Sequence, residues 1–115
     1  MVNEAQFEVT ESEQPRIPVL HVRGEVDVAS APVFHASLHE LIGRDADAVV
    51  VDLSQVSFID STGLGVLVSA ETQVRETGRS IRLVVTHPQI MRLLELTGLD
   101  EVFTILSSTR DAVTA

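Results

Sequence analysis

Residues 49–70 read VVVDLSQVSFIDSTGLGVLVSA, and this stretch decides the fold. It opens on consecutive valines that do not alternate with polar residues, a pattern typical of a central strand buried on both faces of a parallel sheet. The chain then turns at residues 60–63, Asp-Ser-Thr-Gly, and an apolar helical pattern follows with Leu64 and Leu67 on its inner face. A buried strand that leads through a tight turn into a helix predicts an α/β domain with its site at the carboxyl end of the strand.

Strands and helices alternate along the rest of the chain. A polar turn at 11–15 is expected to join the first two strands in an antiparallel hairpin. Ser30 is the expected N-cap of the first helix, and Ser108 opens a capping-box pattern near the end of the chain. The order β-β-α-β-α-β-α-β-α predicts an α/β fold with a mixed, mostly parallel sheet of about five strands and about four helices. The expected strands are 6–10, 17–24, 48–51, 81–85 and 102–106, and the expected helices are 30–43, 61–78, 88–98 and a terminal one from 108 onward.

The composition bounds the class of protein. A chain of 115 residues with 44% hydrophobic and only 3% aromatic residues suits a single domain with an aliphatic core. Eight basic and 17 acidic residues give a net charge of −9, which disfavours direct binding to nucleic acid or to an anionic membrane. The absence of cysteine excludes thiol catalysis and cysteine-ligated zinc. The acidic N-terminus lacks a signal pattern and the longest apolar run, 63–70, is too short to span a membrane, so we expect a cytoplasmic protein.

Ser61 is the residue whose chemistry the local pattern favours. It stands at the start of a helix, where unpaired backbone N–H groups and the positive end of the helix dipole tolerate an anion. A phosphate on its hydroxyl would add about −1.5 to −2 charges without melting the fold, and beside Asp60 it would repel an acidic partner surface. Gly63 and Gly65 are expected to leave the approach open. The alternative is structural, because a Ser or Asp at a helix start is most often only a cap.

Four motifs along the chain carry a family resemblance. They are residues 24–27 (GEVD), 51–54 (VDLS), 58–65 (FIDSTGLG) and 93–100 (LLELTGLD). In these motifs, and in the order of its elements, the chain resembles the STAS family and, within it, the single-domain anti-sigma factor antagonists. The resemblance covers roughly residues 5–113, so residues 1–115 are expected to form one STAS domain.

The resemblance implies a regulator that acts through protein partners. In that family an antagonist binds an anti-sigma factor that is itself a serine kinase, and this binding frees the sigma factor for transcription. The kinase uses ATP to phosphorylate the serine that matches Ser61, which ends the interaction, and a metal-dependent PP2C-type phosphatase restores it. The resemblance thus implies a protein that is not an enzyme and needs no cofactor. We expect a monomer or weak dimer, because no exposed aromatic anchor suggests an obligate dimer.

The same resemblance assigns the partner-binding residues. Asp27 is expected to lie close to Ser61 and to contact the kinase, although it could be only a loop acid. Asp60 is expected to flank the acceptor and shape its loop. Thr62 is disfavoured as the acceptor, because the family's phosphorylated residue directly follows the Asp. The full partner-binding set is Asp27, Asp60, Ser61, Thr62, Gly63, Leu64 and Gly65, of which the last four are expected to form the docking edge of the helix.

Other functional classes stay open at this point. A STAS domain can also serve as a scaffold in a stressosome-like assembly, or as a soluble subunit of a transport system, without phosphoswitching. An enzyme is disfavoured because no acid, base and nucleophile are expected to converge, and His21 is expected to be a surface residue of a strand. His35 and His39 stand four residues apart on a helix, but a metal site would need a third ligand such as Glu40 or His87, so we expect no metal.

Overall fold

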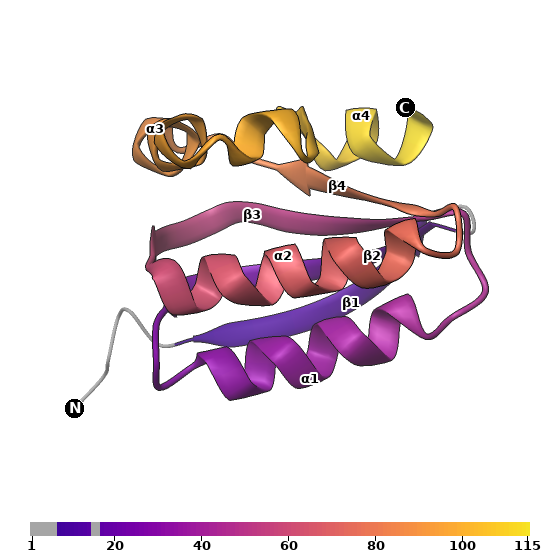
Figure 1. Cartoon of the computed structure of the whole chain (residues 1–115), viewed down its shortest axis with the longest axis horizontal. Helices are drawn as coiled ribbons and strands as arrows, with labels where there is room; N and C mark the ends of the chain where they lie inside the picture. Colours follow the sequence, from indigo (N-terminus) through magenta and orange to yellow (C-terminus); the bar gives the residue numbers. More distant parts are fainter. Residues whose placement is uncertain (1–6, 15–16) are drawn as a thin grey trace.

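A single mixed sheet organises the protein, whose computed structural model describes residues 7–14 and 17–115. The strands are β1 (Glu8–Gln14), β2 (Ile17–Val26), β3 (Ala48–Ile59), β4 (Ser80–Val84) and β5 (Thr104–Leu106), and the helices are α1 (Ala31–Ile42), α2 (Ser61–Arg75), α3 (Pro88–Thr97), the short 3-10 helix η1 (Leu99–Glu101) and α4 (Thr109–Thr114). The strand order is β1-β2-β3-β4-β5; β1 and β2 are antiparallel, and the other neighbours are parallel. This architecture confirms the predicted fold class (Figure 1).

Local capping signals bound α1, α3 and α4 close to where the sequence predicts, whereas α2 ends at Arg75, three residues before the expected stop at Gly78. Gly98 adopts a positive φ of 76° directly after α3, a conformation that favours glycine and stops the helix. The hydroxyl of Ser108 accepts a hydrogen bond from the backbone N–H of Asp111 at 3.0 Å, which caps α4. Ser30 is the N-cap residue of α1, but its side chain makes no bond to that helix.

The first strand differs from the prediction. We expected a polar turn at 11–15, but β1 continues to Gln14 and pairs with β2 from Glu8 opposite Arg23 to Gln14 opposite Ile17. Antiparallel pairing satisfies the backbone N–H and C=O groups whatever the side chains are. A polar edge strand therefore need not show an apolar pattern. Residues 6 and 15, at the ends of the expected strand and turn, lie outside the described residues.

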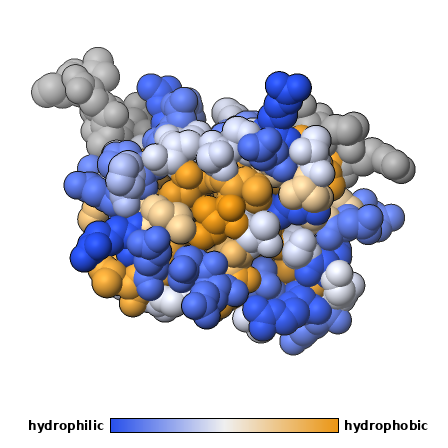
Figure 2. Space-filling view, turned by 90° about the horizontal axis from the view of Figure 1, so that it is seen from above, coloured by the Kyte–Doolittle hydropathy of each residue, from blue (hydrophilic) through white to orange (hydrophobic). Residues whose placement is uncertain are grey.

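The two faces of the sheet are covered unequally. On one face, α1, α2 and α3 contribute to a single large aliphatic cluster that contains the buried Phe34. On the other face, Val19, Val50 and Val84 pack against Ala112 of the short helix α4. Figure 2 views the molecule from the side on which Figure 1 draws α3 and α4, and it shows hydrophobic surface in the middle, framed by hydrophilic residues. Among the described helices, none combines the length and apolar character needed to cross a bilayer.

Candidate functional site

The turn between β3 and α2 is held by Asp60. Its Oδ1 accepts hydrogen bonds from the backbone N–H of Thr62 at 3.0 Å and of Gly63 at 3.1 Å. Asp60 is therefore the N-cap, and Ser61 is the first residue of α2. Two of the N–H groups that we expected to be unpaired are thus already bonded. Ser61 is exposed and its hydroxyl is not part of the cap, so it is accessible at the positive end of the helix dipole.

Asp27 follows the neighbouring strand at the same edge of the sheet. Val26 stands opposite Ile59 in the parallel register of β2 and β3, and the N–H of Asp60 donates to the carbonyl of Val26 at 3.1 Å. The loop that begins at Asp27 therefore lies beside the turn that carries Ser61. The carboxylate of Asp27 accepts hydrogen bonds from the backbone N–H groups of the two residues that precede α1, at 3.0 and 3.1 Å. Asp27 thus shapes its own loop and remains half-exposed.

The helix residues after Ser61 divide between surface and core. Thr62 and Gly65 are exposed, whereas Gly63 and Leu64 are buried. A Cβ at Gly63 would stand 2.6 Å from Cγ1 of Val26, but a Cβ at Gly65 would meet no atom within 4 Å. The expectation that Gly63 opens the approach to the serine is therefore wrong, because this glycine lets α2 pack closely on the strand ends. Only Gly65 leaves open surface beside the serine.

Apolar side chains are exposed on the elements that meet at this turn. Val28 is 71% exposed in the loop after β2, and Val33 is 51% exposed in the first turn of α1. Val68 is 38% exposed and follows Ser61 by two helical turns, on the same side of α2. Phe58, 47% exposed, comes just before the turn, so the expectation that no aromatic side chain is exposed is wrong. An exposed apolar patch with a polar rim is typical of a protein-docking surface.

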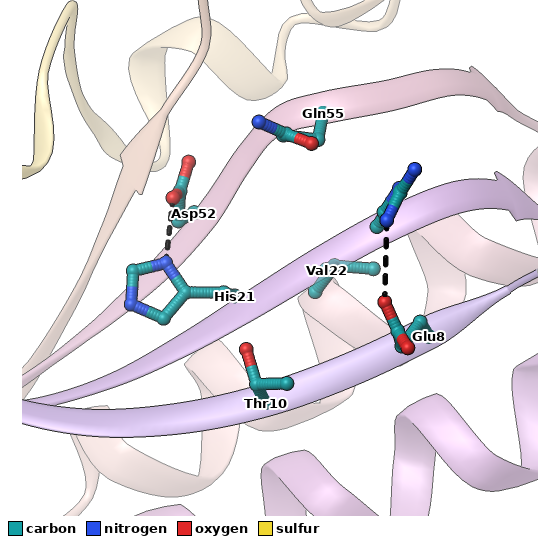
Figure 3. A pocket seen from close by; sticks show the side chains of 7 residues that line it. Glu8, Thr10, His21, Val22, Asp52 and Gln55 are labelled. Carbon is teal, nitrogen blue, oxygen red and sulfur yellow. Dashed lines mark hydrogen bonds and ion pairs between the residues drawn. The ribbon is translucent and has the colours of Figure 1, made fainter.

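A second polar cluster, which the sequence analysis missed, crosses β1, β2 and β3. Nδ1 of His21 lies 2.8 Å from Oδ2 of Asp52, and Nε2 of His21 lies 2.9 Å from the hydroxyl of Ser12 (Figure 3 shows the histidine and the aspartate). Asp52 is only 8% exposed. Burial raises the pKa of Asp52, but hydrogen bonds from Ser54 and from His21 outweigh it and hold this pKa below its ordinary value.

A hydroxyl, an imidazole and a carboxylate therefore lie within hydrogen-bond distance of one another on the sheet, a cluster that the expected surface position of His21 did not include. His21 is half-buried and bonded on both ring nitrogens, instead of being a free surface residue. The cluster is separate from Ser61, because Asp52 precedes Asp60 by eight residues of extended chain, about 26 Å at 3.3 Å per residue. One sequence signal could have pointed to it: His21 and Asp52 each interrupt an otherwise apolar strand segment.

The remaining histidines form no metal centre in the part of the chain that the structure describes. The rings of His35 and His39 lie side by side on α1, with centroids 4.2 Å apart and planes tilted by 40°. Glu40, one of the expected third ligands, lies 3.7 Å from Arg44. No group of three or more potential ligands occurs among residues 7–14 and 17–115.

Comparison with known proteins decides the family. The model of the STAS domain family matches residues 8–112, which is nearly the whole chain. The chain belongs to the STAS domain family. The STAS match also includes the two segments that hold Asp27 and Ser61, at the ends of β2 and β3.

The relatives of this STAS domain are regulators. The anti-sigma-B factor antagonist of Bacillus subtilis is 36% identical over 94 residues, which cover 82% of this chain and 85% of the relative. The anti-sigma-F factor antagonist RsfB of Mycobacterium tuberculosis is 32% identical over 108 residues, covering 92% and 86%. A crystal structure of an anti-sigma factor antagonist from Mycobacterium paratuberculosis superposes with a TM-score of 0.89 at 26% identity, covering 99% and 97%. These names designate regulatory proteins that act on anti-sigma factors, and none designates an enzyme.

Proposed function

We propose that this protein is an anti-sigma factor antagonist that binds an anti-sigma factor serine kinase and loses this binding when the kinase phosphorylates Ser61. The observation that carries the proposal is the exposed hydroxyl of Ser61 at the first position of α2, outside the cap that Asp60 makes. The antagonist role is supported by relatives that match over more than four fifths of the chain.

A phosphate at this position would change binding more than folding. Ser61 already points to solvent and starts a helix, so the fold needs no rearrangement and the dipole favours the anion by about 0.3–1 kcal/mol. In a complex the same phosphate would be pressed against the partner and lie close to the carboxylates of Asp60 and Asp27. A charge buried without a counter-charge costs several kcal/mol. The modification would therefore act as an off-switch for the interface.

The docking surface we propose is built around Ser61 from three elements. Gly65 and Val68 extend the exposed side of α2, and Val28 and Val33 add apolar contacts from the loop after β2 and from α1. Asp27 supplies the charged edge, where it would contact the kinase. Gly63 and Leu64 are buried and contribute indirectly, because they hold the start of α2 against the sheet.

The switch is complete only if the phosphate can be removed. A PP2C-type phosphatase, whose divalent metal belongs to that enzyme, would restore the hydroxyl of Ser61 and with it the binding. The kinase and the phosphatase supply the chemistry, and this chain supplies the substrate hydroxyl. Such a role requires a cytoplasmic protein, which agrees with the composition.

Phosphorylation is tested with the serine kinase that the protein captures from extracts of its host. The purified chain is incubated with this kinase and ATP, and its peptides are mapped by mass spectrometry. We expect one phosphate, on Ser61, in the wild type and in Thr62→Ala, and none in Ser61→Ala. Thr62→Ala is the matched control because Thr62 is the neighbouring exposed hydroxyl. A phosphate that persists in Ser61→Ala would rule out Ser61 as the acceptor.

Binding is tested by titrating the kinase with two variants. Ser61→Ala should bind like the unmodified protein, whereas Ser61→Asp should bind at least about 100-fold more weakly, since each 1.4 kcal/mol is a factor of ten. Thermal unfolding of both variants checks that the fold is retained. Equal affinities in folded variants would contradict the switch and would favour a constitutive scaffold role.

A further inference from the structure

Ser12, His21 and Asp52 form a continuous hydrogen-bonded chain over three neighbouring strands. The hydroxyl of Ser12 on β1 lies 2.9 Å from Nε2 of His21 on β2, and Nδ1 of the same ring lies 2.8 Å from Oδ2 of Asp52 on β3. The pairing of the strands produces this order. In the antiparallel register Ser12 stands opposite Val19, two residues before His21, so Ser12 and His21 are diagonal neighbours on one face of the sheet. In the parallel register His21 stands beside Asp52.

The protons in this chain follow from the surroundings of Asp52. Its Oδ1 accepts the backbone N–H of Ser54 at 2.9 Å, and Thr109 lies 3.4 Å from its Oδ2. These contacts favour an ionised carboxylate, so Nδ1 of His21 must carry the proton that it donates to Asp52. In the neutral ring Nε2 then has a free lone pair and can accept the proton of the Ser12 hydroxyl. A nucleophile bonded to a base, with the base oriented by a third group, is the signature of an activated serine.

Two of the three residues border a cavity, and Ser12 reaches the surface outside its lining. His21 and Asp52 line a cavity of about 270 Å³ on the sheet face, together with Thr10, Arg23 and Gln55. Figure 3 shows the ring of His21 between Asp52 and Thr10, with Gln55 further along β3, the strand that carries Asp52. The helix α4 covers the neighbouring part of this face, where Ala112 packs on Val19 and Val50. Ser12 itself is half-exposed.

We propose that Ser12 is a nucleophilic serine that accepts an acyl group from small activated acyl donors such as acyl phosphates or aryl esters. Oγ of Ser12 forms a bond to the acyl carbon while Nε2 of His21 takes the hydroxyl proton. The bond from that carbon to the phosphate or phenolate breaks, and the imidazolium returns its proton to the leaving group or to solvent. The products are acyl-Ser12 and the free phosphate or phenol, with no change of oxidation state. Asp52 is a positioning residue, because it acts on Ser12 only through the ring of His21.

The amino-acid composition leaves few competing nucleophiles for an acyl donor. The sequence contains no lysine and no cysteine, so the amines and thiols that usually react with acyl donors are absent apart from the chain's own terminal amine. A general base contributes about 10²–10⁴-fold to such a reaction. The acylation of Ser12 should therefore stand far above that of any other hydroxyl in the protein.

The experiment treats the full-length chain with p-nitrophenyl acetate, follows the release of p-nitrophenolate and maps the acetyl group by mass spectrometry. We expect one acetyl group, on Ser12, and none in Ser12→Ala. His21→Gln should slow acetylation of Ser12 at least about 100-fold, and Asp52→Asn should slow it while circular dichroism stays native. Ser57→Ala is the matched control, since Ser57 is an exposed serine of the same sheet and should leave the rate unchanged.

A second measurement does not depend on variants. Acetylation of Ser12 in the wild type should be lost in urea and should return on refolding, because unfolded serines have no oriented base. Acetyl groups found only on the terminal amine or on other hydroxyls would overturn the proposal. So would a folded His21→Gln variant that is acetylated at Ser12 as fast as the wild type. The outcome is independent of the kinase and binding assays at Ser61.

Discussion

Replacing Gly63 with alanine measures how closely α2 is packed on the strand ends. An added Cβ would stand 2.6 Å from Cγ1 of Val26 and 2.7 Å from Cγ1 of Ile59. Carbon atoms in ordinary contact are about 3.5–4.0 Å apart, so the start of α2 would have to move by about 1 Å or both side chains would have to leave their positions. Both are buried, with Val26 at 0% and Ile59 at 4% exposure, so neither can turn into solvent.

The expected loss of stability combines two opposing effects. Overpacking in a well-packed core costs about 1–3 kcal/mol. Alanine is a better helix former than glycine by about 1 kcal/mol, which offsets part of this cost. Since two buried side chains would stand closer than 3.0 Å to the added Cβ, we expect an overpacking cost of about 2–3 kcal/mol. After the gain in helix propensity, Gly63→Ala should lower the free energy of unfolding by about 1–2 kcal/mol and the Tm by roughly 4 °C per kcal/mol.

The same helix provides the matched control. Gly65 is two residues further along α2, is exposed, and has no atom within 4 Å of an added Cβ. Gly65→Ala therefore carries the gain in helix propensity without the clash and should raise the free energy of unfolding by about 0.5–1 kcal/mol. The two substitutions are chemically identical, so any difference between them comes from the surroundings of the Cβ.

The assay is urea and thermal unfolding of the wild type and both variants, followed by circular dichroism at several protein concentrations. The packing argument requires shifts of opposite sign. If Gly63→Ala were as stable as the wild type, or if both variants were stabilised alike, helix propensity alone would describe the data. The close approach of α2 to β2 and β3 would then be refuted.

Three further predictions concern single side chains. Asp60→Ala should lower the Tm, because loss of the N-cap costs about 1 kcal/mol, whereas Asp60→Asn should stay near the wild type; equal Tm values would exclude the capping role. Because the pKa of Asp52 is lowered in the folded state, its ionised carboxylate stabilises the fold above the unfolded pKa of about 3.9. This stabilisation is lost as the pH falls through the folded pKa. Urea midpoints should therefore drop more steeply below about pH 4 in the wild type than in Asp52→Asn. Phe34→Ala should cost about 3–5 kcal/mol in urea unfolding, because Phe34 is fully buried; a loss below 1 kcal/mol would contradict its place in the core.

Much of the fold was predictable because its signals act over a few residues. The valine run of β3, the proline that begins α3, and Gly98 with its positive φ each mark an element by local backbone preference. The position of Ser61 at a helix start was predictable for the same reason. The length of β1 was not, because its polar residues become a strand only through pairing with β2.

The roles of individual site residues depended on contacts that are distant in sequence. The amino-acid sequence by itself determined the α/β order, the aliphatic acidic character and an Asp-Ser-Thr-Gly turn after a buried strand. Only the tertiary structure decided that Gly63 faces Val26, and that His21 meets Asp52 across 31 residues of chain. The physical reason is that propensity and periodicity act within a turn or two of the chain. Strand register and helix docking, in contrast, are chosen by how the whole core closes.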